Sequence, residues 1–431
     1  MKRKHWWLCL GILILISFAC NLPKATPTPA YTADIITEMA KTVNAQMTQI
    51  ASPLPTTQPL PSVNATLPAT VIQAGPLSPD IDALVNAYMS GDSHVPGLAV
   101  GVIEVSGDNN PVYRMGFYGV RSKDTGAKPT ADTLFEIGSE TKLFTATLLA
   151  FMVNKGQIKL DDPIQAYLPD DVHAPTYAGQ QIKIIDLATH RSGLPDTPAN
   201  RPKDVRKPYT VQDMYDWLNS YKLTRAPGSQ WEYSNIGFGL LGTILVRVAG
   251  TPYDSLITQY LGKPLNMPDV TQFPSTDQST RLAVGYNEKG NPAIPVSQEE
   301  GGAAVNENRV VGGGQLYATL NDMARFAAAN LDLIGDENVT KAFDLTQQIF
   351  ADGDKPGAKM GLGWQMGPEQ DSAGARMMWK DGLTDGFHSY IALFKGKDVK
   401  YAVFLLGNGV TKDGLEPLGF QIYKQFSGVN N

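Results

Sequence analysis

One serine in the sequence is followed three residues later by a lysine, at the start of a predicted helix. The motif is Ser139-Glu140-Thr141-Lys142, and apolar residues follow it at helical spacing up to Gly156, a residue type that commonly ends helices. A spacing of three places both side chains on one helix face. An amine one turn away can take the proton of a serine hydroxyl and make it a nucleophile. The spacing predicts nucleophilic chemistry at Ser139, although a single S-x-x-K motif also arises by chance.

A second motif pairs a tyrosine with an asparagine two residues later. Tyr233-Ser234-Asn235 precedes a run of small and apolar residues from 236 to 242, which predicts a buried helix. A phenol and an amide at the entrance of such a helix can face the same cleft. Tyr-Ser-Asn is also ordinary turn chemistry, so this motif alone leaves both interpretations open.

A third motif lies at the end of a predicted strand. Lys380 is followed by Asp381, Gly382 and Leu383, and a second glycine follows at 386. Glycine permits a close approach of the backbone to a ligand. The alternative is a solvent-exposed Lys-Asp-Gly turn.

Other catalytic and metal-binding arrangements have less support. No G-x-S-x-G elbow occurs, and the five histidines form no HExxH pair. We therefore expect no metal and no organic cofactor. His190 and His388 would permit a Ser-His-Asp triad, but we expect the first to belong to a loop and the second to begin a strand. The glycines at 312–314 lack the lysine of a phosphate-binding loop.

Composition narrows the class of protein further. The 431 residues include 36 Lys+Arg and 42 Asp+Glu, for a net charge of −6, and no long basic run. This balance argues against a nucleic-acid partner. Apolar residues make up 42% of the chain, enough for a sizeable core. The only cysteines are Cys9 and Cys20, so the folded part has neither a disulfide nor a cysteine nucleophile.

The three motifs have to be positioned by one folded unit, from about 80 to 431. The middle of this unit is mostly helical. Strand patterns occupy 97–105, 112–121, 377–380, 389–394 and 399–406, and helical patterns occupy 81–89 and 415–426. This order predicts an α/β (α+β) fold, in which an antiparallel sheet is flanked by terminal helices. We expect the sheet to come from 80–135 and 300–431, and an all-helical insertion from about 139 to 299.

The first 79 residues predict a secretion signal followed by a linker that tethers the folded unit to a membrane. Basic residues 2–4 precede an uncharged apolar run at 6–19, which is too short to span a bilayer and is typical of a secretory signal. The segment 16–20 resembles a bacterial lipobox, although Ser17 stands where leucine is commonest. The resemblance implies cleavage before Cys20, which removes the signal peptide 1–19, and lipidation of Cys20. An ordinary signal peptide that ends near a cysteine is the alternative. The Pro-rich segment 20–79 predicts an extended linker, with helical spacing over 35–50. We expect an exported lipoprotein, anchored on the extracytoplasmic face of a membrane.

In this order, the three motifs resemble those of the serine β-lactamase and penicillin-binding protein superfamily. The resemblance is strongest to the class C β-lactamase branch, with its S-x-x-K, Y-x-N and K-T-G motifs, and the superfamily also includes carboxylesterases. Further phrases that fit the family lie at 187–195, 312–319 and 361–364. The resemblance covers the whole predicted folded unit, and it implies an α/β domain beside a helical domain with the active site at their junction.

The resemblance also implies a role for each matching residue. Ser139 would be the acylated nucleophile and Lys142 its partner in proton transfer. Tyr233 would pass a proton to the leaving group, and Lys380 would orient Tyr233. Asn235 would bind a substrate amide or carbonyl. Either Lys142 or Tyr233 would serve as the general base, because clustered positive charge makes both a neutral amine and a phenolate accessible near neutral pH.

The third motif also supplies the substrate-binding residues that the resemblance implies. The backbone N–H groups of Ser139 and Leu383 would form the oxyanion hole, with Gly382 beside them. Asp381 stands where the family usually has threonine, whose hydroxyl helps to hold a substrate carboxylate. An aspartate that faces the cleft would repel that carboxylate, whereas one that points into solvent would not.

These features predict a hydrolase that acts through an acyl-enzyme on Ser139. Because of Asp381 we expect esterase-like or peptidase-like activity rather than efficient β-lactam hydrolysis, with a class C β-lactamase or D-Ala-D-Ala carboxypeptidase as the alternative. A non-catalytic protein that binds peptidoglycan or β-lactams is an alternative of another class. The expected partner is a small-molecule or peptide substrate derived from the cell wall, and we expect a monomer.

Overall fold

The structure is a computed structural model. It describes residues 74–91, 95–106, 110–203, 207, 209–295, 310–369, 375–397, 399–411 and 413–427. The predicted signal peptide, Cys20 and nearly all of the predicted linker, including 35–50, lie outside the described residues. Everything below concerns the folded unit that carries the three motifs.

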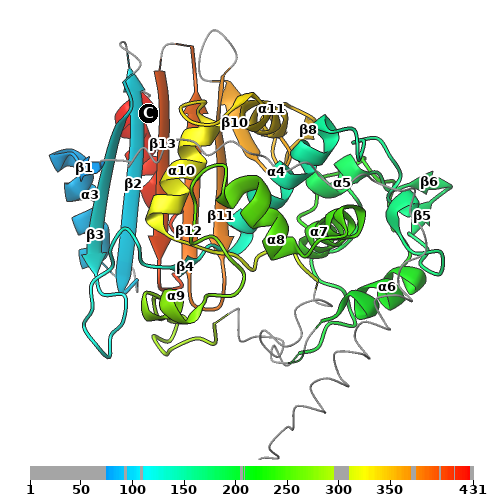
Figure 1. Cartoon of the computed structure of the whole chain (residues 1–431), viewed down its shortest axis with the longest axis horizontal. Helices are drawn as coiled ribbons and strands as arrows, with labels where there is room; N and C mark the ends of the chain where they lie inside the picture. The colour runs from blue at the N-terminus through cyan, green and yellow to red at the C-terminus, as the bar shows by residue number, and fades with distance from the viewer. Residues whose placement is uncertain are drawn as a thin grey trace, which may run out of the picture. The chain divides into compact units, whose positions relative to one another are not determined.

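In the described part of the chain, nine strands form one sheet, which Figure 1 shows beside a helical region. Its spatial order is β1 (Ala74–Pro76), β3 (Val112–Gly119), β2 (Gly97–Ser106), β13 (Val399–Gly407), β12 (His388–Lys395), β11 (Arg376–Leu383), β10 (Gln365–Glu369), β9 (Lys359–Met360) and β8 (Ala351–Asp352). Neighbouring strands are antiparallel, except that β1 lies parallel to β3. The predicted antiparallel sheet is thus confirmed except at this edge. Two short strand pairs outside it are formed by β4 (Phe135–Glu136) with β7 (Tyr317–Ala318) and by β5 (Thr176–Tyr177) with β6 (Gln180–Gln181), and there are also isolated bridges.

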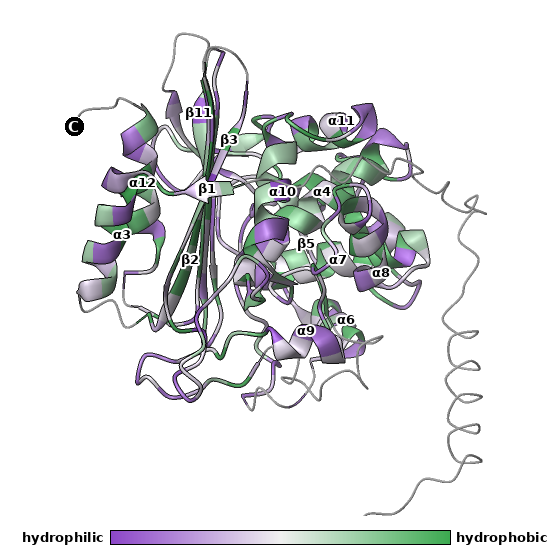
Figure 2. Cartoon of the chain, turned by 60° about the vertical axis from the view of Figure 1, so that its left-hand side comes forward, coloured by the Kyte–Doolittle hydropathy of each residue, from purple (hydrophilic) through white to green (hydrophobic). Residues whose placement is uncertain are grey.

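Helices cover both faces of the sheet, as the edge-on view in Figure 2 shows. The terminal helices α3 (Pro79–Ser90) and α12 (Glu416–Ser427) lie on one face, as the sequence predicts. The helices on the other side are α4 (Thr141–Asn154), α5 (Ile184–Ala188), α6 (Val211–Ser220), α7 (Asn235–Ala249), α8 (Tyr253–Ile257), α9 (Thr276–Thr280), α10 (Leu320–Asn330) and α11 (Glu337–Thr346). Short turns of other helix types are η1 (Gly138–Glu140), η2 (Ile164–Tyr167) and η3 (Thr258–Gly262).

The central strands contribute to two hydrophobic cores at once. In β2, Ala99 and Ile103 belong to the large core beneath the helical region, whereas Val100 and Val102 belong to a smaller core beneath α3 and α12. Successive side chains of a strand point to opposite faces, so a strand covered on both faces needs apolar residues at nearly every position. This requirement explains the continuous run of apolar residues and glycine over 97–103 of β2.

The boundary between helices and sheet differs from the predicted one. The sheet resumes at Ala351 rather than near 300, since α10 and α11 precede β8. Helix α10 packs against β2 and β13, and α11 packs against α4. The apolar residues of 320–346 recur at helical spacing and cover the sheet instead of extending it.

Helix α4, which follows the first motif, runs through the middle of the large core. Every residue from Thr141 to Met152 is buried, so the helix is enclosed on all sides and not only on the predicted apolar face. Its end is as predicted. Gly156 has a φ of +70°, its N–H donates to the Val153 carbonyl (2.9 Å), and the N–H of Gln157 donates to the Met152 carbonyl (2.9 Å). This pair of bonds is the Schellman arrangement that closes a helix.

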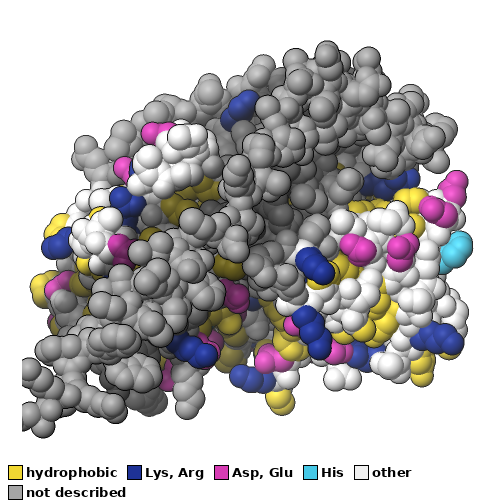
Figure 3. Space-filling model, turned by 90° about the horizontal axis from the view of Figure 1, so that it is seen from below, with side chains coloured by type: hydrophobic (Ala, Val, Ile, Leu, Met, Phe, Trp, Pro, Cys, Tyr) yellow, Lys and Arg dark blue, Asp and Glu magenta, His cyan; other side chains and the backbone are white. Residues whose placement is uncertain are grey.

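The described surface carries charges of both signs, and the described helices are short. Figure 3 shows acidic and basic side chains interspersed on the visible described surface. Within the described residues no single helix meets the length and hydropathy of a membrane span; the pair Asn235–Ala249 and Tyr253–Gly262 meets them only jointly, with a bend of 78° between its halves.

Candidate active site

The first motif lies where the N-terminal end of α4 meets the end of β11. Ser139 belongs to the η1 turn that leads into α4, and the glycine before it has a φ of +47°. A Cβ on Gly138 would lie 2.6 Å from the backbone nitrogen of Leu383, which no side chain allows. Glycine therefore lets the backbone beside the nucleophile approach the end of β11. This approach brings the peptide groups of Ser139 and Leu383, the predicted oxyanion hole, to the same place.

Lys142 is fully buried and donates three hydrogen bonds. Its Nζ lies 2.9 Å from Ser139 Oγ, 2.6 Å from Asn235 Oδ1 and 2.5 Å from the Gly313 carbonyl. An ammonium group has three N–H donors, so these contacts satisfy all of them. A neutral amine in the same place would have a lone pair with which to accept the Ser139 proton.

Tyr233 approaches the same hydroxyl from the loop that leads into α7. Its Oη lies 2.6 Å from Ser139 Oγ, and either atom can be the donor. The Nζ atoms of Lys142 and Lys380 lie 4.9 and 5.2 Å from the centre of the Tyr233 ring. Ser139 Oγ is therefore in hydrogen-bond contact with an amine and a phenol at once, and either can take its proton.

The charges of the two lysines change the acidity of the phenol. Burial alone would raise the pKa of Tyr233, but the positive charges of Lys142 and Lys380 outweigh burial and hold this pKa below its usual value. The pKa of Lys142 is lowered by burial and by the charge of Lys380, against the opposing effect of Tyr233. Both shifts favour proton acceptance near neutral pH.

Asn235 is held by the way α7 begins. Ser234 caps this helix, because its Oγ accepts from the Gly237 N–H at 2.9 Å and donates to the Pro195 carbonyl at 2.7 Å. The Asn235 side chain accepts from Lys142 and donates through Nδ2 to Asp196 Oδ1 at 2.7 Å. These bonds fix which end of the amide faces the lysine.

Lys380 and Asp381 form an ion pair at the end of β11. Lys380 Nζ lies 3.2 Å from Asp381 Oδ1; the lysine side chain is 3% exposed and the aspartate side chain 50%. Burial opposes the charge of Lys380, but Tyr233 and the Asp381 carboxylate outweigh it and raise its pKa. Burial likewise opposes the charge of Asp381, and Lys380 keeps that pKa low. Asp381 is thus a charged, half-exposed group attached to a cleft lysine.

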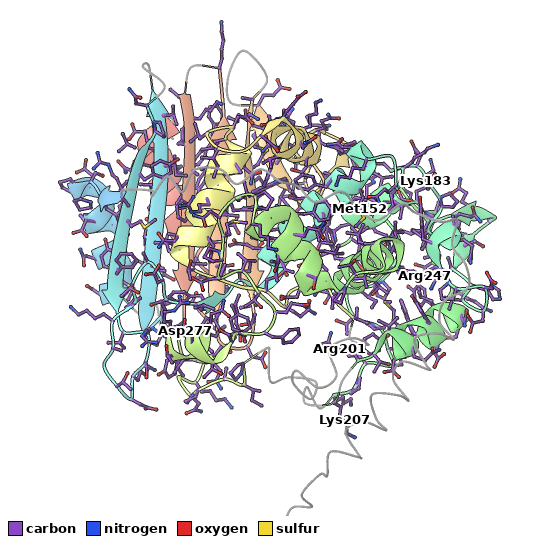
Figure 4. All side chains as sticks on the ribbon, in the orientation of Figure 1. Met152, Lys183, Arg201, Lys207, Arg247 and Asp277 are labelled. Atoms are coloured by element: carbon purple, nitrogen blue, oxygen red, sulfur yellow. The ribbon has the colours of Figure 1, made fainter. Side chains whose placement is uncertain are left out.

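The strand that carries this pair leaves one edge open. β10 pairs with β11 no further than Trp379, whereas β12 pairs with it as far as Leu383. A cavity of about 200 Å³ lies beside this edge and is lined by Ser139, Asn235, Gly313, Leu383 and eleven other residues. One of these others is Arg201, labelled in Figure 4, from the loop that leads to α6. A substrate that enters the cavity meets Ser139 and Leu383.

The structure therefore brings together seven of the predicted site residues: Ser139, Lys142, Tyr233, Asn235, Lys380, Asp381 and Leu383. Gly382 lies between the last two on β11, and Cys20 is outside the described residues. Sequence reasoning missed Asp196 and the carbonyl of Gly313. Asp196 directly follows the family-like phrase at 187–195, and Gly313 lies inside another, so position within those phrases was the available signal.

The two histidines are not arranged as a triad. In the described residues neither one hydrogen-bonds to Ser139: His190 Nδ1 accepts from the Ser234 N–H at 3.1 Å, and His388 Nδ1 accepts from the Thr411 N–H at 3.4 Å. Among the same residues, no three His, Cys, Asp or Glu side chains are grouped as metal ligands would be.

Comparison with known proteins points to one family. The beta-lactamase family matches residues 81–421. The D-alanyl-D-alanine-carboxypeptidase/endopeptidase AmpH of Escherichia coli K12 is 32% identical over 379 residues, which cover 83% of this chain and 92% of the relative.

Solved structures agree with this match. A beta-lactamase/D-alanine carboxypeptidase from Yersinia pestis has 25% identity and a TM-score of 0.65, over 81% of this chain and 98% of its own. A class C beta-lactamase from Rhodobacter sphaeroides has 24% identity and a TM-score of 0.66, over 80% and 98%. At 24% identity, the likeness to the Rhodobacter sphaeroides structure shows the fold alone. The predicted fold class is confirmed.

Proposed function

Because this chain belongs to the beta-lactamase family of serine hydrolases, we propose that it cleaves an ester or amide through an acyl-enzyme on Ser139. The observation that carries the proposal is the position of Ser139 Oγ, 2.9 Å from Lys142 Nζ and 2.6 Å from Tyr233 Oη. The hydroxyl proton passes to one of these two groups as Oγ attacks the substrate carbonyl. The negative oxygen that forms is stabilised by the backbone N–H groups of Ser139 and Leu383.

Departure of the leaving group and hydrolysis of the acyl-enzyme use the same groups. Tyr233 donates a proton to the leaving alkoxide or amine, and the leaving group departs as the acyl-enzyme forms. Water then loses a proton to the same network, attacks the ester and releases the acid, while Ser139 Oγ recovers its proton. Lys380 stays positive throughout and stabilises the phenolate form of Tyr233.

A labelling experiment tests this mechanism. A fluorophosphonate should attach to Ser139, as mapped by peptide mass spectrometry, and Ser139→Ala should remain unlabelled. Tyr233→Phe should label about 100-fold more slowly, in line with the loss of an acid–base group. A label on a different serine would contradict the assignment. A non-catalytic binding protein, the alternative of another class, would show no ester or amide turnover.

For the substrate, we propose an ester or an amide that lacks a free carboxylate next to the cleaved bond. The half-exposed Asp381 carboxylate is paired with Lys380, two positions before Leu383, which lines the cavity. The resemblance implies that the residue at this position helps to hold a substrate carboxylate. Two charges about 5 Å apart repel by about 3 kcal/mol at an effective dielectric of about 20, and solvent screening and the partner Lys380 reduce this value. An internal peptide bond has no such carboxylate, and the name of the Escherichia coli relative includes an endopeptidase activity.

Parallel assays distinguish the substrate classes. Short-chain p-nitrophenyl esters should be cleaved faster than a chromogenic cephalosporin or a D-Ala-D-Ala peptide. Asp381→Thr should shift the preference toward the two carboxylate-bearing substrates. Efficient cephalosporin hydrolysis that Asp381→Thr leaves unchanged would favour the alternative, a class C β-lactamase or D-Ala-D-Ala carboxypeptidase.

We also propose that the enzyme is an exported lipoprotein. The support is the sequence pattern at 1–20, in which a basic start and an apolar run lead to Cys20. Stable anchoring needs two or more acyl chains, and the polar linker has little apolar surface of its own. Cell fractionation of Cys20→Ala should move the protein from the membrane to the soluble fraction. Full retention in the membrane fraction would contradict lipidation.

A further inference from the structure

His190 lies directly behind the tyrosine of the active site and is 2% exposed. The centre of its ring is 4.5 Å from that of Tyr233, with 34° between the planes, and 5.0 Å from that of Phe238. The phenol therefore has the imidazole on one side of its ring and, within about 5 Å of the ring centre, two amines.

His190 also holds the backbone on both sides of Tyr233. Its Nδ1 accepts from the Ser234 N–H at 3.1 Å, and its carbonyl accepts from the Glu232 N–H at 2.8 Å. The residue itself has a φ of +57°, a conformation that few side chains tolerate and that histidine, asparagine and aspartate adopt most often. One residue thus holds the N–H of the residue before Tyr233 and the N–H of the residue after it.

The bond to Ser234 also requires a neutral imidazole. An Nδ1 that accepts an N–H has no proton, so the ring proton is on Nε2. Protonation would aim two N–H donors at each other and would add a cation near Lys142 of α4 and Lys380 of β11. Burial, followed by the charges of those two lysines, keeps the pKa of His190 well below its usual value. Besides Tyr233, the aromatic rings packed on His190 are those of Trp231 and Phe238, which carry no charge.

We propose that His190 is a positioning residue, which holds Tyr233 against Ser139 through the acceptor at Nδ1 and through its own carbonyl. The inference rests on the acyl-enzyme function proposed above. A displacement of about 1 Å in a catalytic group can lower a rate about 100-fold. The 2.6 Å contact between Tyr233 and Ser139 depends on the backbone that His190 holds.

Two substitutions separate the acceptor from the ring. His190→Phe keeps an aromatic ring behind Tyr233 but removes Nδ1. His190→Asn removes the ring but places Oδ1 close to where Nδ1 lies, and asparagine tolerates the positive φ. The rate of fluorophosphonate labelling at Ser139 should fall by about tenfold to 100-fold in His190→Phe and should stay within about threefold of wild type in His190→Asn.

The pH profile adds a readout that a purely structural role would not move. In His190→Phe the acidic limb of the labelling rate should shift to higher pH, because a displaced Tyr233 is less stabilised as a phenolate by Lys142 and Lys380. Phe326→Leu, a buried substitution in α10, controls for a general loss of stability and should label at the wild-type rate. Equal losses in both His190 variants, or none in either, would overturn the proposal.

A measurement on the unaltered protein covers the case in which His190→Phe does not fold. The ¹⁵N chemical shifts of the His190 ring should show an unprotonated Nδ1 and a protonated Nε2 from pH 8 down to pH 5.5. A protonated Nδ1 in that range would overturn the proposal. Absence of any label on wild-type Ser139 would instead contradict the proposed function itself, so the two failures are distinguishable.

Discussion

Two buried lysines face the same tyrosine from different parts of the molecule, and their surroundings differ in one respect. Lys142, on α4, is fully buried, and Lys380, on β11, is 3% exposed. The groups that contact the Lys142 amine are a hydroxyl, an amide oxygen and a backbone carbonyl, none of which carries a full charge. The Lys380 amine contacts a carboxylate, that of Asp381.

The two pKa values shift in opposite directions, although burial lowers both. Burial and the charge of Lys380 prevail at Lys142, whose pKa falls. Tyr233 and Asp381 prevail over burial at Lys380, whose pKa rises. Depth in the protein therefore does not decide which amine can give up its proton; a neighbouring carboxylate does. We infer that Lys142 exchanges protons during the reaction, whereas Lys380 acts as a constant charge.

The largest effect is expected when residue 142 can no longer exchange a proton. Lys142→Ala should lower the rate of Ser139 labelling by about 100-fold or more, because an acid–base group is lost. Lys142→Arg should fail to restore it, since a guanidinium stays protonated at all working pH values. Stopped-flow labelling with a fluorophosphonate measures both rates, and a Lys142→Arg enzyme of near wild-type rate would show that charge alone suffices.

Replacing Lys380 by arginine should lower the labelling rate much less than replacing Lys142 by arginine. Lys380→Arg keeps a positive charge beside Tyr233 and Asp381, so its labelling rate should remain well above that of Lys142→Arg. Lys380→Ala removes the charge, and its rate should approach that of Tyr233→Phe. If the order of the two arginine variants were reversed, the assignment of a constant charge to Lys380 would be wrong.

A third change should make the surroundings of Lys380 more like those of Lys142. Asp381→Asn removes the carboxylate that raises the pKa of Lys380. A raised pKa keeps the amine charged until the pH rises through that value, so a lower pKa means that the charge is lost at a lower pH. The alkaline limb of the labelling rate should shift to lower pH in the variant. Superimposable pH profiles would show that Asp381 does not control the charge of Lys380.

The smallest expected effect concerns stability rather than rate. Glu140, next to the nucleophile, is fully buried, and neither of its carboxyl oxygens has a hydrogen-bond partner in the described part of the chain. Ser389 lies beside it, but its hydroxyl donates to the Ile137 carbonyl at 2.9 Å. Burial raises the pKa of Glu140 well above its usual range, against the opposing effects of Ser389 and Lys380.

The sign of the resulting pH dependence follows from this shift. A carboxyl with a raised pKa in the folded state stabilises the fold least at high pH, because the unfolded chain ionises freely above about 4.3. Relative to wild type, Glu140→Gln should therefore become more stable as the pH rises from 5 to 8, as measured by urea unfolding. A stability difference that stays constant over this range would mean that Glu140 is not protonated in the folded protein.

Local sequence pattern predicted the long strands of the sheet, the terminal helices and the helices after the first two motifs, but not the short strands or the point at which the sheet resumes. Strands β2, β3, β12 and β13 and helices α3 and α12 lie within a few residues of their predicted ranges, because periodicity and turn residues are local signals. The start of the returning sheet was predicted near 300 and lies at Ala351. The apolar residues of α10 and α11 recur at helical spacing, but which elements they cover is decided only by their packing on β2, β13 and α4.

The sequence by itself determined which residues carry the chemistry, since the S-x-x-K, Y-x-N and Lys-Asp-Gly motifs each specify residue types at fixed spacing. It could not determine how these motifs meet. The contacts of Lys142 with Asn235 and Gly313 join residues 93 and 171 positions apart. The open strand edge beside Lys380 and Asp381 depends on where β10 stops pairing with β11, and the neutral imidazole behind Tyr233 depends on a residue 44 positions away from Ser234. The strengths and charge states of these contacts depend on distance and burial, which exist only once the sheet and the helices have packed together.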